Sequence, residues 1–131
     1  MSGHPDPGAL LARSTALPGG VRVILRLARV RDLGPVQDLV AREGRGLDHW
    51  EIARLLHSSP RERVVLCATA LLDGHETVVG FGAVGLDGAG TAALVVADSE
   101  RAPGVGSLLY EALLGRAESL ARARRTRDRA A

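Results

Sequence analysis

The sequence predicts a single α+β domain with three layers, in which a mostly antiparallel sheet lies between helices. Its 131 residues suffice for one domain with one hydrophobic core. Three segments of β type follow one another between residues 64 and 97, and short turn sequences separate them, which favours antiparallel pairing. Helical periodicity precedes and follows these segments, so the predicted order is strand, helix, helix, strand, strand, strand, helix.

The N-terminal half supplies one strand and two helices. The strand is expected at residues 21–27, where apolar and polar residues alternate, and a helical pattern follows at 33–40 with Asp32 as its expected N-cap. A second helix is expected at 48–57, because it opens with the capping-box sequence Asp-His-Trp-Glu.

A β-hairpin follows the two helices. Residues 64–72 are apolar and partly β-branched, which is typical of a buried strand. The turn residues Asp-Gly-His occupy positions 73–75, and a second strand is expected over 76–86. Gly80 and Gly82 interrupt the alternation of this strand and indicate a bulge.

The last strand, expected at 91–97, runs through a glycine loop at 98–106 directly into the final helix. Unpaired backbone N–H groups and the positive end of the helix dipole meet at such a junction, which makes it suited to bind phosphate. Gly104 and Gly106 let the backbone approach a ligand closely or take positive φ, and Arg101 adds a charge-assisted contact.

The loop carries a resemblance to a known family. Residues 101–106 read Arg-Ala-Pro-Gly-Val-Gly and resemble the Arg/Gln-x-x-Gly-x-Gly/Ala motif of the GNAT superfamily of N-acetyltransferases. The residues at 94–96 resemble the fourth strand of that family, those at 106–109 its third helix, and those at 26–39 its first strand and helix. The chain is identified as a C-terminally short member, since it ends before the family's fifth strand, fourth helix and further strands.

The resemblance implies that acetyl-coenzyme A is the co-substrate and that its acetyl group passes to an amine that the sequence does not identify. The pantetheine arm would pair near Leu94, and the amide of Val96 would bind the thioester oxygen. The pyrophosphate would lie beside Arg101, and Pro103 has no N–H to offer it. The amides expected to hold the pyrophosphate belong to Ala102, Gly104, Val105, Gly106 and Ser107.

The sequence assigns no catalytic base or acid. The residues considered for these roles are His75, Glu76, Asp87, Asp98 and Tyr110, and each has a simpler structural explanation in a turn, a strand end or a helix. Cys67 is interpreted as a packing residue and Trp50 as a hydrophobic anchor of the second helix. Two hypotheses therefore stay open: an active N-acetyltransferase, or a catalytically inactive GNAT-like module that binds coenzyme A or mediates protein interaction.

Composition excludes several other classes. The chain has no lysine, so Walker A and Schiff-base chemistry are excluded, and its one cysteine rules out an internal disulfide. The four histidines lack metal-ligand spacing, and no metal is expected. A Rossmann site is excluded because Leu109 occupies the position of the third glycine.

The domain is expected to span residues 21–124, with a flexible tail at 1–20 and a basic tail at 125–131. Neither a signal peptide nor a membrane span is apparent, so the protein is expected to be cytoplasmic, and its arginine- and alanine-rich composition fits a bacterial source. The expected partner is a small-molecule or peptide amine. The arginine run is interpreted as a solvated helix end, so neither nucleic acid nor membrane is expected as a partner. A homodimer would supply a strand to the exposed edge beside 91–97.

Overall fold

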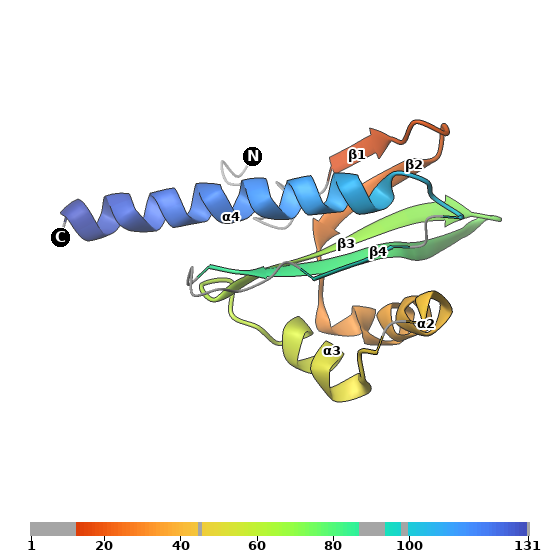
Figure 1. Cartoon of the computed structure of the whole chain (residues 1–131), viewed down its shortest axis with the longest axis horizontal. Coiled ribbons are helices and arrows are strands. Elements are labelled where there is room, and N and C mark those ends of the chain that lie inside the picture. The colour runs from red at the N-terminus through yellow and green to blue at the C-terminus, as the bar shows by residue number, and fades with distance from the viewer. Residues whose placement is uncertain (1–12, 45, 87–93, 98–99, 131) are drawn as a thin grey trace, which may run out of the picture.

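A five-stranded antiparallel sheet with strand order β1-β2-β3-β4-β5 forms the centre of the domain (Figure 1). The structure is a computed structural model, and it describes residues 13–44, 46–86, 94–97 and 100–130. Its elements are β1 (Arg13–Ala16), β2 (Arg22–Leu27), the short 3-10 helix η1 (Val30–Asp32), α2 (Leu33–Glu43), α3 (His49–Leu56), β3 (Arg63–Leu72), β4 (His75–Gly85), β5 (Leu94–Ala97) and α4 (Val105–Ala130).

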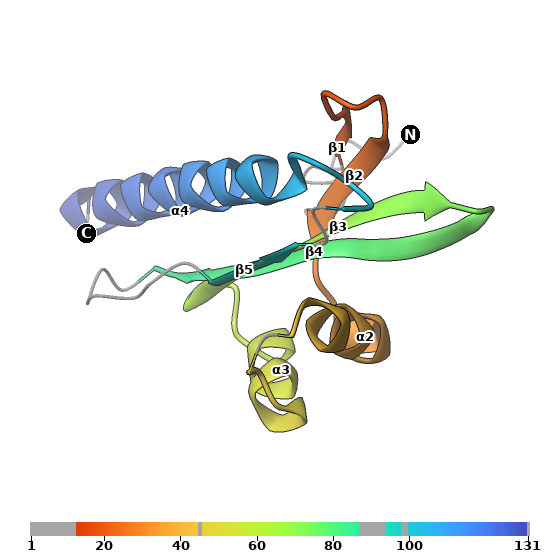
Figure 2. The ribbon, with the colours of Figure 1, turned by 45° about the vertical axis from the view of Figure 1, so that its right-hand side comes forward.

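The sheet separates two hydrophobic layers, because successive side chains of a strand point to opposite faces. α4 covers one face, and α2 and α3 cover the other (Figure 2). On the α4 side the buried residues include Val23, Leu25, Leu66, Leu109 and Leu113. On the other side they include Val36, Leu39, Ile52, Cys67 and Phe81. The predicted three-layer α+β architecture is therefore confirmed.

The β3–β4 hairpin closes through a two-residue turn at Asp73 and Gly74. Both residues have positive φ angles, 52° and 80°, as a type I′ turn requires, so the Asp-Gly sequence was a correct signal. Further along the hairpin Ala68 pairs with Gly80 and Thr69 with Val78. One residue of β4 is thus left over, and the predicted bulge lies immediately before Gly80.

The glycines of β4 bring α4 close to the sheet. A Cβ atom at Gly82 would lie 2.4 Å from Leu113 Cδ1, and one at Gly80 would lie 3.1 Å from Leu109 Cδ2. Because neither glycine carries a side chain, the apolar face of α4 packs directly on the β4 backbone. These two residues therefore set the height of α4, and with it the position of the loop that precedes it.

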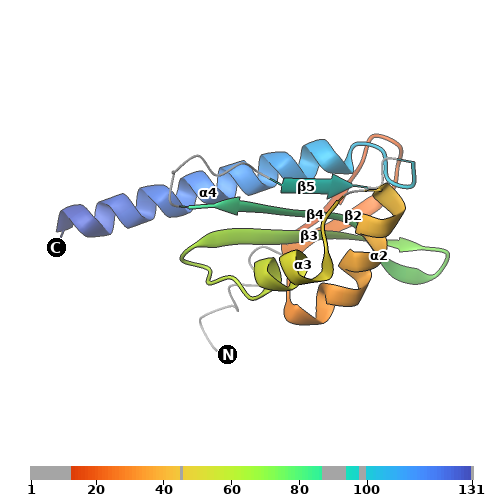
Figure 3. The same ribbon diagram turned by 60° about the horizontal axis from the view of Figure 1, so that its bottom comes forward.

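Two segments depart from the sequence prediction. Residues 13–16, expected to belong to a flexible tail, form β1 and pair with β2 in the register Ser14↔Ile24. The helical segment also continues past residue 124, since α4 extends to Ala130 and projects beyond the strands (Figures 1 and 3). The expected basic tail at 125–130 is thus the last part of this helix, while residues 1–12 lie outside the described structure.

Candidate functional site

The predicted junction of strand, loop and helix forms at one edge of the sheet. β5 is the last strand in the sheet order and pairs with β4 in the register Phe81↔Val96. α4 then runs back beside β5 (Figure 3). Its first turn lies directly over the end of the strand, because a Cβ atom at Gly106 would meet Ala97 Cβ at 3.6 Å.

Two buried side chains anchor the described part of the loop. Ala102 and Val105 are both 0% exposed and belong to the hydrophobic layer beneath α4. Between them Gly104 has a φ of 94°, a left-handed conformation that favours glycine. A Cβ atom there would also lie 3.3 Å from Pro18 Cδ, in the turn between β1 and β2. Gly104 therefore has the role in backbone geometry that the sequence predicted.

The amides of the loop divide into two groups. The Val105 amide donates to the Ala102 carbonyl oxygen at 3.1 Å, and Ala102 is itself fully buried, so neither amide is presented to solvent. Gly104 and Ser107 are exposed and Gly106 is partly exposed. No described residue accepts a hydrogen bond from the amides of these three. Of the five residues predicted to supply amides, Gly104, Gly106 and Ser107 are thus at least partly exposed and have amides without a described acceptor.

The two predicted residues of β5 lie on the face of the sheet that α2 and α3 cover. Val96 is 0% exposed, and Leu94 is partly buried against the same hydrophobic layer. Residues 94 and 96 are two apart, so their amides point to the same edge of the strand. A ligand arm along the outer edge of β5 would therefore meet both amides or neither.

The considered acid–base residues do not converge in the described structure. His75 and Glu76 begin β4 at the hairpin end, and Asp87 and Asp98 lie outside the described residues. Tyr110 is 45% exposed on α4. The described structure assigns no base among His75, Glu76 and Tyr110.

Trp50 and Cys67 differ in how well they match expectation. Trp50 is 76% exposed and meets His49 edge to face, so it is no hydrophobic anchor for α3. That helix is instead held by the buried Ile52 and Leu56 and begins with the expected capping box of Asp48 and Glu51.

Cys67 is fully buried in β3, and burial, with the nearby Asp32 carboxylate, raises the pKa of its thiol to about 12.

A polar cluster that the sequence did not predict lies beside α2. Arg26 donates two hydrogen bonds of 2.8 Å to the Asp32 carboxylate, which also accepts from the Arg29 amide at 2.7 Å. Burial by itself would raise the pKa of Asp32, but the hydrogen bonds from Arg26 and the Arg29 amide outweigh it and lower that pKa. Asp32 occupies the expected N-cap position of α2, but its carboxylate makes no capping hydrogen bond there and holds β2 to the turn before α2. Glu76 extends the cluster at 3.8 Å from Arg26.

Two other features, a metal-binding cluster and a membrane-spanning helix, are absent from the described residues. These residues contain no group of three or more His, Cys, Asp or Glu side chains that is placed to hold a metal ion. None of their helices is both long and apolar enough to cross a bilayer.

Comparison with known proteins places this geometry in a fold. No protein-family profile and no curated protein sequence matches the chain. The crystal structure of the GNAT domain of S. lividans PAT matches it with a TM-score of 0.67 and 22% sequence identity. The match covers 88% of this chain and 77% of that one, which includes most of the elements described above. This likeness shows the architecture, and the chain has the GNAT fold.

Proposed function

We propose that the protein binds acetyl-coenzyme A at the loop before α4 and transfers the acetyl group to an amine. One observation carries the proposal: the amides of Gly104, Gly106 and Ser107 face solvent without a described partner at the start of a 26-residue helix. A pyrophosphate is the natural ligand of such a site, because it satisfies the unpaired amides and interacts favourably with the helix dipole. The GNAT fold supports the same assignment.

Arg101 and Pro103 shape the mouth of this site. Arg101 is exposed beside the loop, where its guanidinium offers a charge-assisted contact to an anionic ligand. Pro103 is also exposed and has no N–H, so the loop carries fewer donors than a motif with another residue at this position. We expect affinity for coenzyme A to depend mainly on the amides of Gly104, Gly106 and Ser107.

The acetyl group would lie along the outer edge of β5. The amine attacks the thioester carbonyl carbon, the carbonyl oxygen gains negative charge, and the Val96 amide would donate to that oxygen. When the intermediate collapses, the carbon–sulfur bond breaks, the amide product forms and coenzyme A leaves as a thiolate that takes up a proton. Leu94 would hold the pantetheine arm, since its amide points to the same edge as that of Val96.

A homodimer would complete this edge. Tyr110 and Leu114 are 45% and 38% exposed, and they follow Gly106 along the flank of α4 that meets β5. Apolar side chains beside an unpaired strand edge favour pairing with another strand. A strand from a second copy would cover both features and form the other wall of a pantetheine cleft. Sedimentation of the protein with and without a Tyr110→Glu substitution tests this step, and an unchanged monomeric mass in both would contradict it.

The second candidate is a GNAT-like module that binds coenzyme A or a protein without catalysis. The small number of accessible amides in the loop favours this candidate. The amides of Ala102 and Val105 are not accessible to a ligand, and Pro103 has no N–H. Both candidates share the loop, but only the first releases thiol. They are therefore separated by turnover and not by binding.

Calorimetric titration with coenzyme A tests the shared step. Gly106→Glu places a carboxylate where the phosphate would lie, and its Cβ atom fits because the nearest atom is 3.6 Å away. We expect wild type to bind and Gly106→Glu to lose at least about tenfold in affinity. Gly115→Glu is the matched control, since it changes the same residue type in open space on the same helix. Absence of coenzyme A binding to wild type would overturn the transferase and the coenzyme A-binding form of the module, and would leave only a module that binds a protein.

Thiol release from acetyl-coenzyme A across a panel of amines then separates them. Release that depends on the amine and disappears in Gly106→Glu supports the transferase. Binding of coenzyme A without release by monomer or dimer supports the module.

A further inference from the structure

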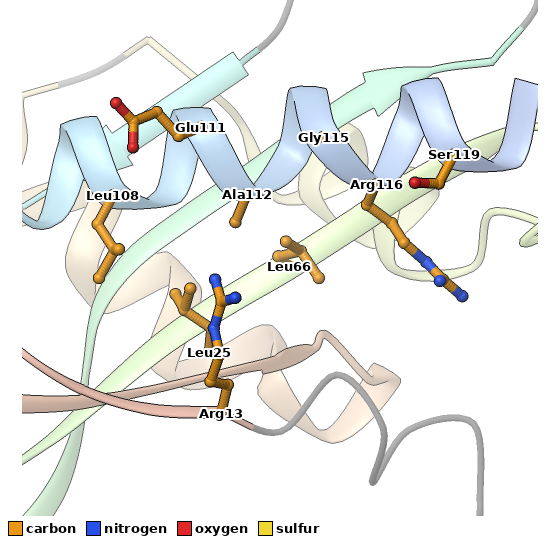
Figure 4. Close-up of a pocket in the computed structure, with 9 residues that line it drawn as sticks. All are labelled: Arg13, Leu25, Leu66, Leu108, Glu111, Ala112, Gly115, Arg116 and Ser119. Carbon is orange, nitrogen blue, oxygen red and sulfur yellow. The ribbon is translucent and has the colours of Figure 1, made fainter.

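A cavity of about 330 Å³ lies on the other flank of α4, between this helix and strands β1, β2 and β3 (Figure 4). Its helix wall includes Leu108, Ala112 and Arg116. With 3.6 residues per turn, Leu108 and Ala112 lie on the opposite side of α4 from Tyr110 and Leu114. This α4 cavity is therefore distinct from the loop and from the edge of β5.

The floor of the α4 cavity is apolar, and its walls carry both apolar and polar groups. Leu25 of β2 and Leu66 of β3 form its floor and belong to the buried layer beneath α4, and Leu108 extends this surface from the helix. Its volume is at the lower end of the range of small-molecule sites, roughly 300–1,000 Å³. Both properties fit a short aliphatic chain.

Two arginines lie on either side of the floor. Figure 4 shows the Arg13 guanidinium between β1 and α4 on one side of Leu66, and the Arg116 side chain on the other. The Nε atom of Arg116 is buried and has no hydrogen-bond partner. Within the described part of the chain neither guanidinium forms an ion pair, and the carboxylate of Glu111 points away from the floor.

A buried N–H donor without an acceptor costs free energy, which a ligand recovers when it supplies the acceptor. The Nε–H and one Nη–H of a guanidinium form a planar fork that matches the two oxygens of a carboxylate. Arg13 adds a second positive charge at the same cavity. The electrostatics therefore select an anion, and the apolar floor selects one with a hydrocarbon chain.

We propose that the α4 cavity binds a short-chain aliphatic carboxylate. Its chain lies on Leu25, Leu66 and Leu108. The Arg116 side chain turns toward the cavity when the ligand binds, so that its fork, whose Nε is buried in the unliganded protein, donates hydrogen bonds to the carboxylate. None of its residues is among those assigned to coenzyme A, although Leu108 directly follows Ser107.

Titration calorimetry with hexanoate tests the proposal. Two comparison ligands separate the contribution of the hydrocarbon chain from that of the charge. 1-Hexanol keeps the chain without the charge, and acetate keeps the charge with almost no chain. We expect saturable binding of hexanoate and binding at least about tenfold weaker for each comparison ligand. No saturable binding of hexanoate at millimolar concentration, or equal binding of 1-hexanol, would overturn the proposal.

Three variants locate the site. Arg116→Gln removes the fork and should weaken hexanoate binding at least about tenfold. Gly115→Leu should also weaken it, because this residue lines the α4 cavity and its Cβ position is open space that a larger side chain would fill. Arg122→Gln is the control, since Arg122 is an exposed arginine further along the same helix. Thermal unfolding confirms that each variant is folded. Hexanoate binding that is unchanged in Gly115→Leu, or reduced as much in Arg122→Gln, refutes this location.

Discussion

Gly82→Ala tests whether α4 is held close to the sheet by the absence of a side chain on β4. The new Cβ atom would lie 2.4 Å from Leu113 Cδ1 and 2.8 Å from the Leu94 carbonyl oxygen. Non-bonded heavy atoms are normally about 3.5–4.0 Å apart. Leu113 must therefore move by more than about 1 Å, and the β5 backbone must shift as well.

The expected cost follows from these two contacts. Overpacking of this kind costs about 1–3 kcal/mol, whereas replacing a strand glycine by alanine would otherwise gain about 0.5–1 kcal/mol. We expect a net loss of about 1–2 kcal/mol in the free energy of unfolding, which corresponds to a Tm lowered by roughly 4–7 °C in a domain of this size.

Thermal and urea unfolding measure the effect, with two glycine controls. Gly80→Ala should cost less than Gly82→Ala, because its closest contact is 3.1 Å, to the end of the flexible Leu109 side chain. Gly115→Ala should raise the free energy of unfolding by up to about 1 kcal/mol, since it lies in a helix with open space around it. If Gly82→Ala were as stable as wild type, the close packing of α4 on β4 would be refuted.

Two further predictions concern the titratable groups beneath α2. Asp32→Asn leaves Arg26 without its anionic partner and should cost about 2–4 kcal/mol in the free energy of unfolding. This value lies toward the lower part of the range for a broken buried pair, because the Arg26 side chain is 17% exposed. The pKa of Asp32 is lowered in the folded state, so its contribution is complete above the unfolded pKa of about 3.9 and is lost as the pH falls toward the folded value. Urea unfolding from pH 7 down to pH 3, a range that crosses the unfolded pKa, should show a shallower loss of stability below about pH 4 in Asp32→Asn than in wild type, and identical profiles would contradict the role of the pair. Cys67 should react with a thiol reagent at pH 8 only as the protein unfolds, because its pKa of about 12 and its burial leave almost no accessible thiolate; rapid labelling of the native protein would show otherwise.

Local signals in the sequence predicted most of the elements. The Asp-Gly turn at 73–74 requires positive φ angles that these residues tolerate, and the capping box at Asp48 satisfies helix amides within one turn. The same holds for Gly104, whose φ of 94° reflects its lack of a Cβ atom. Each of these features depends on residues that are close in the chain, so spacing and residue type were sufficient.

β1 and the Arg26–Asp32 pair depended on contacts that residue type does not reveal. The four residues of β1 carry no apolar alternation, and their pairing is decided by the backbone of β2. Arg26 belongs to an alternating strand pattern and Asp32 to a helix start, and each had a complete local explanation. Only the turn at η1 brings the carboxylate within 2.8 Å of the guanidinium.

The loop before α4 shows the same division at the candidate functional site. Residue order alone predicted a glycine loop with an arginine between a strand and a helix. It did so because anion binding at a helix start is a local property of the backbone. Packing then decided which amides face outward: Ala102 and Val105 are buried beneath α4, while Gly104, Gly106 and Ser107 stay accessible. The α4 cavity likewise arises where β1, β2, β3 and the helix meet, since Arg13 and Arg116 are distant in the chain and become neighbours of one cavity only when the sheet forms.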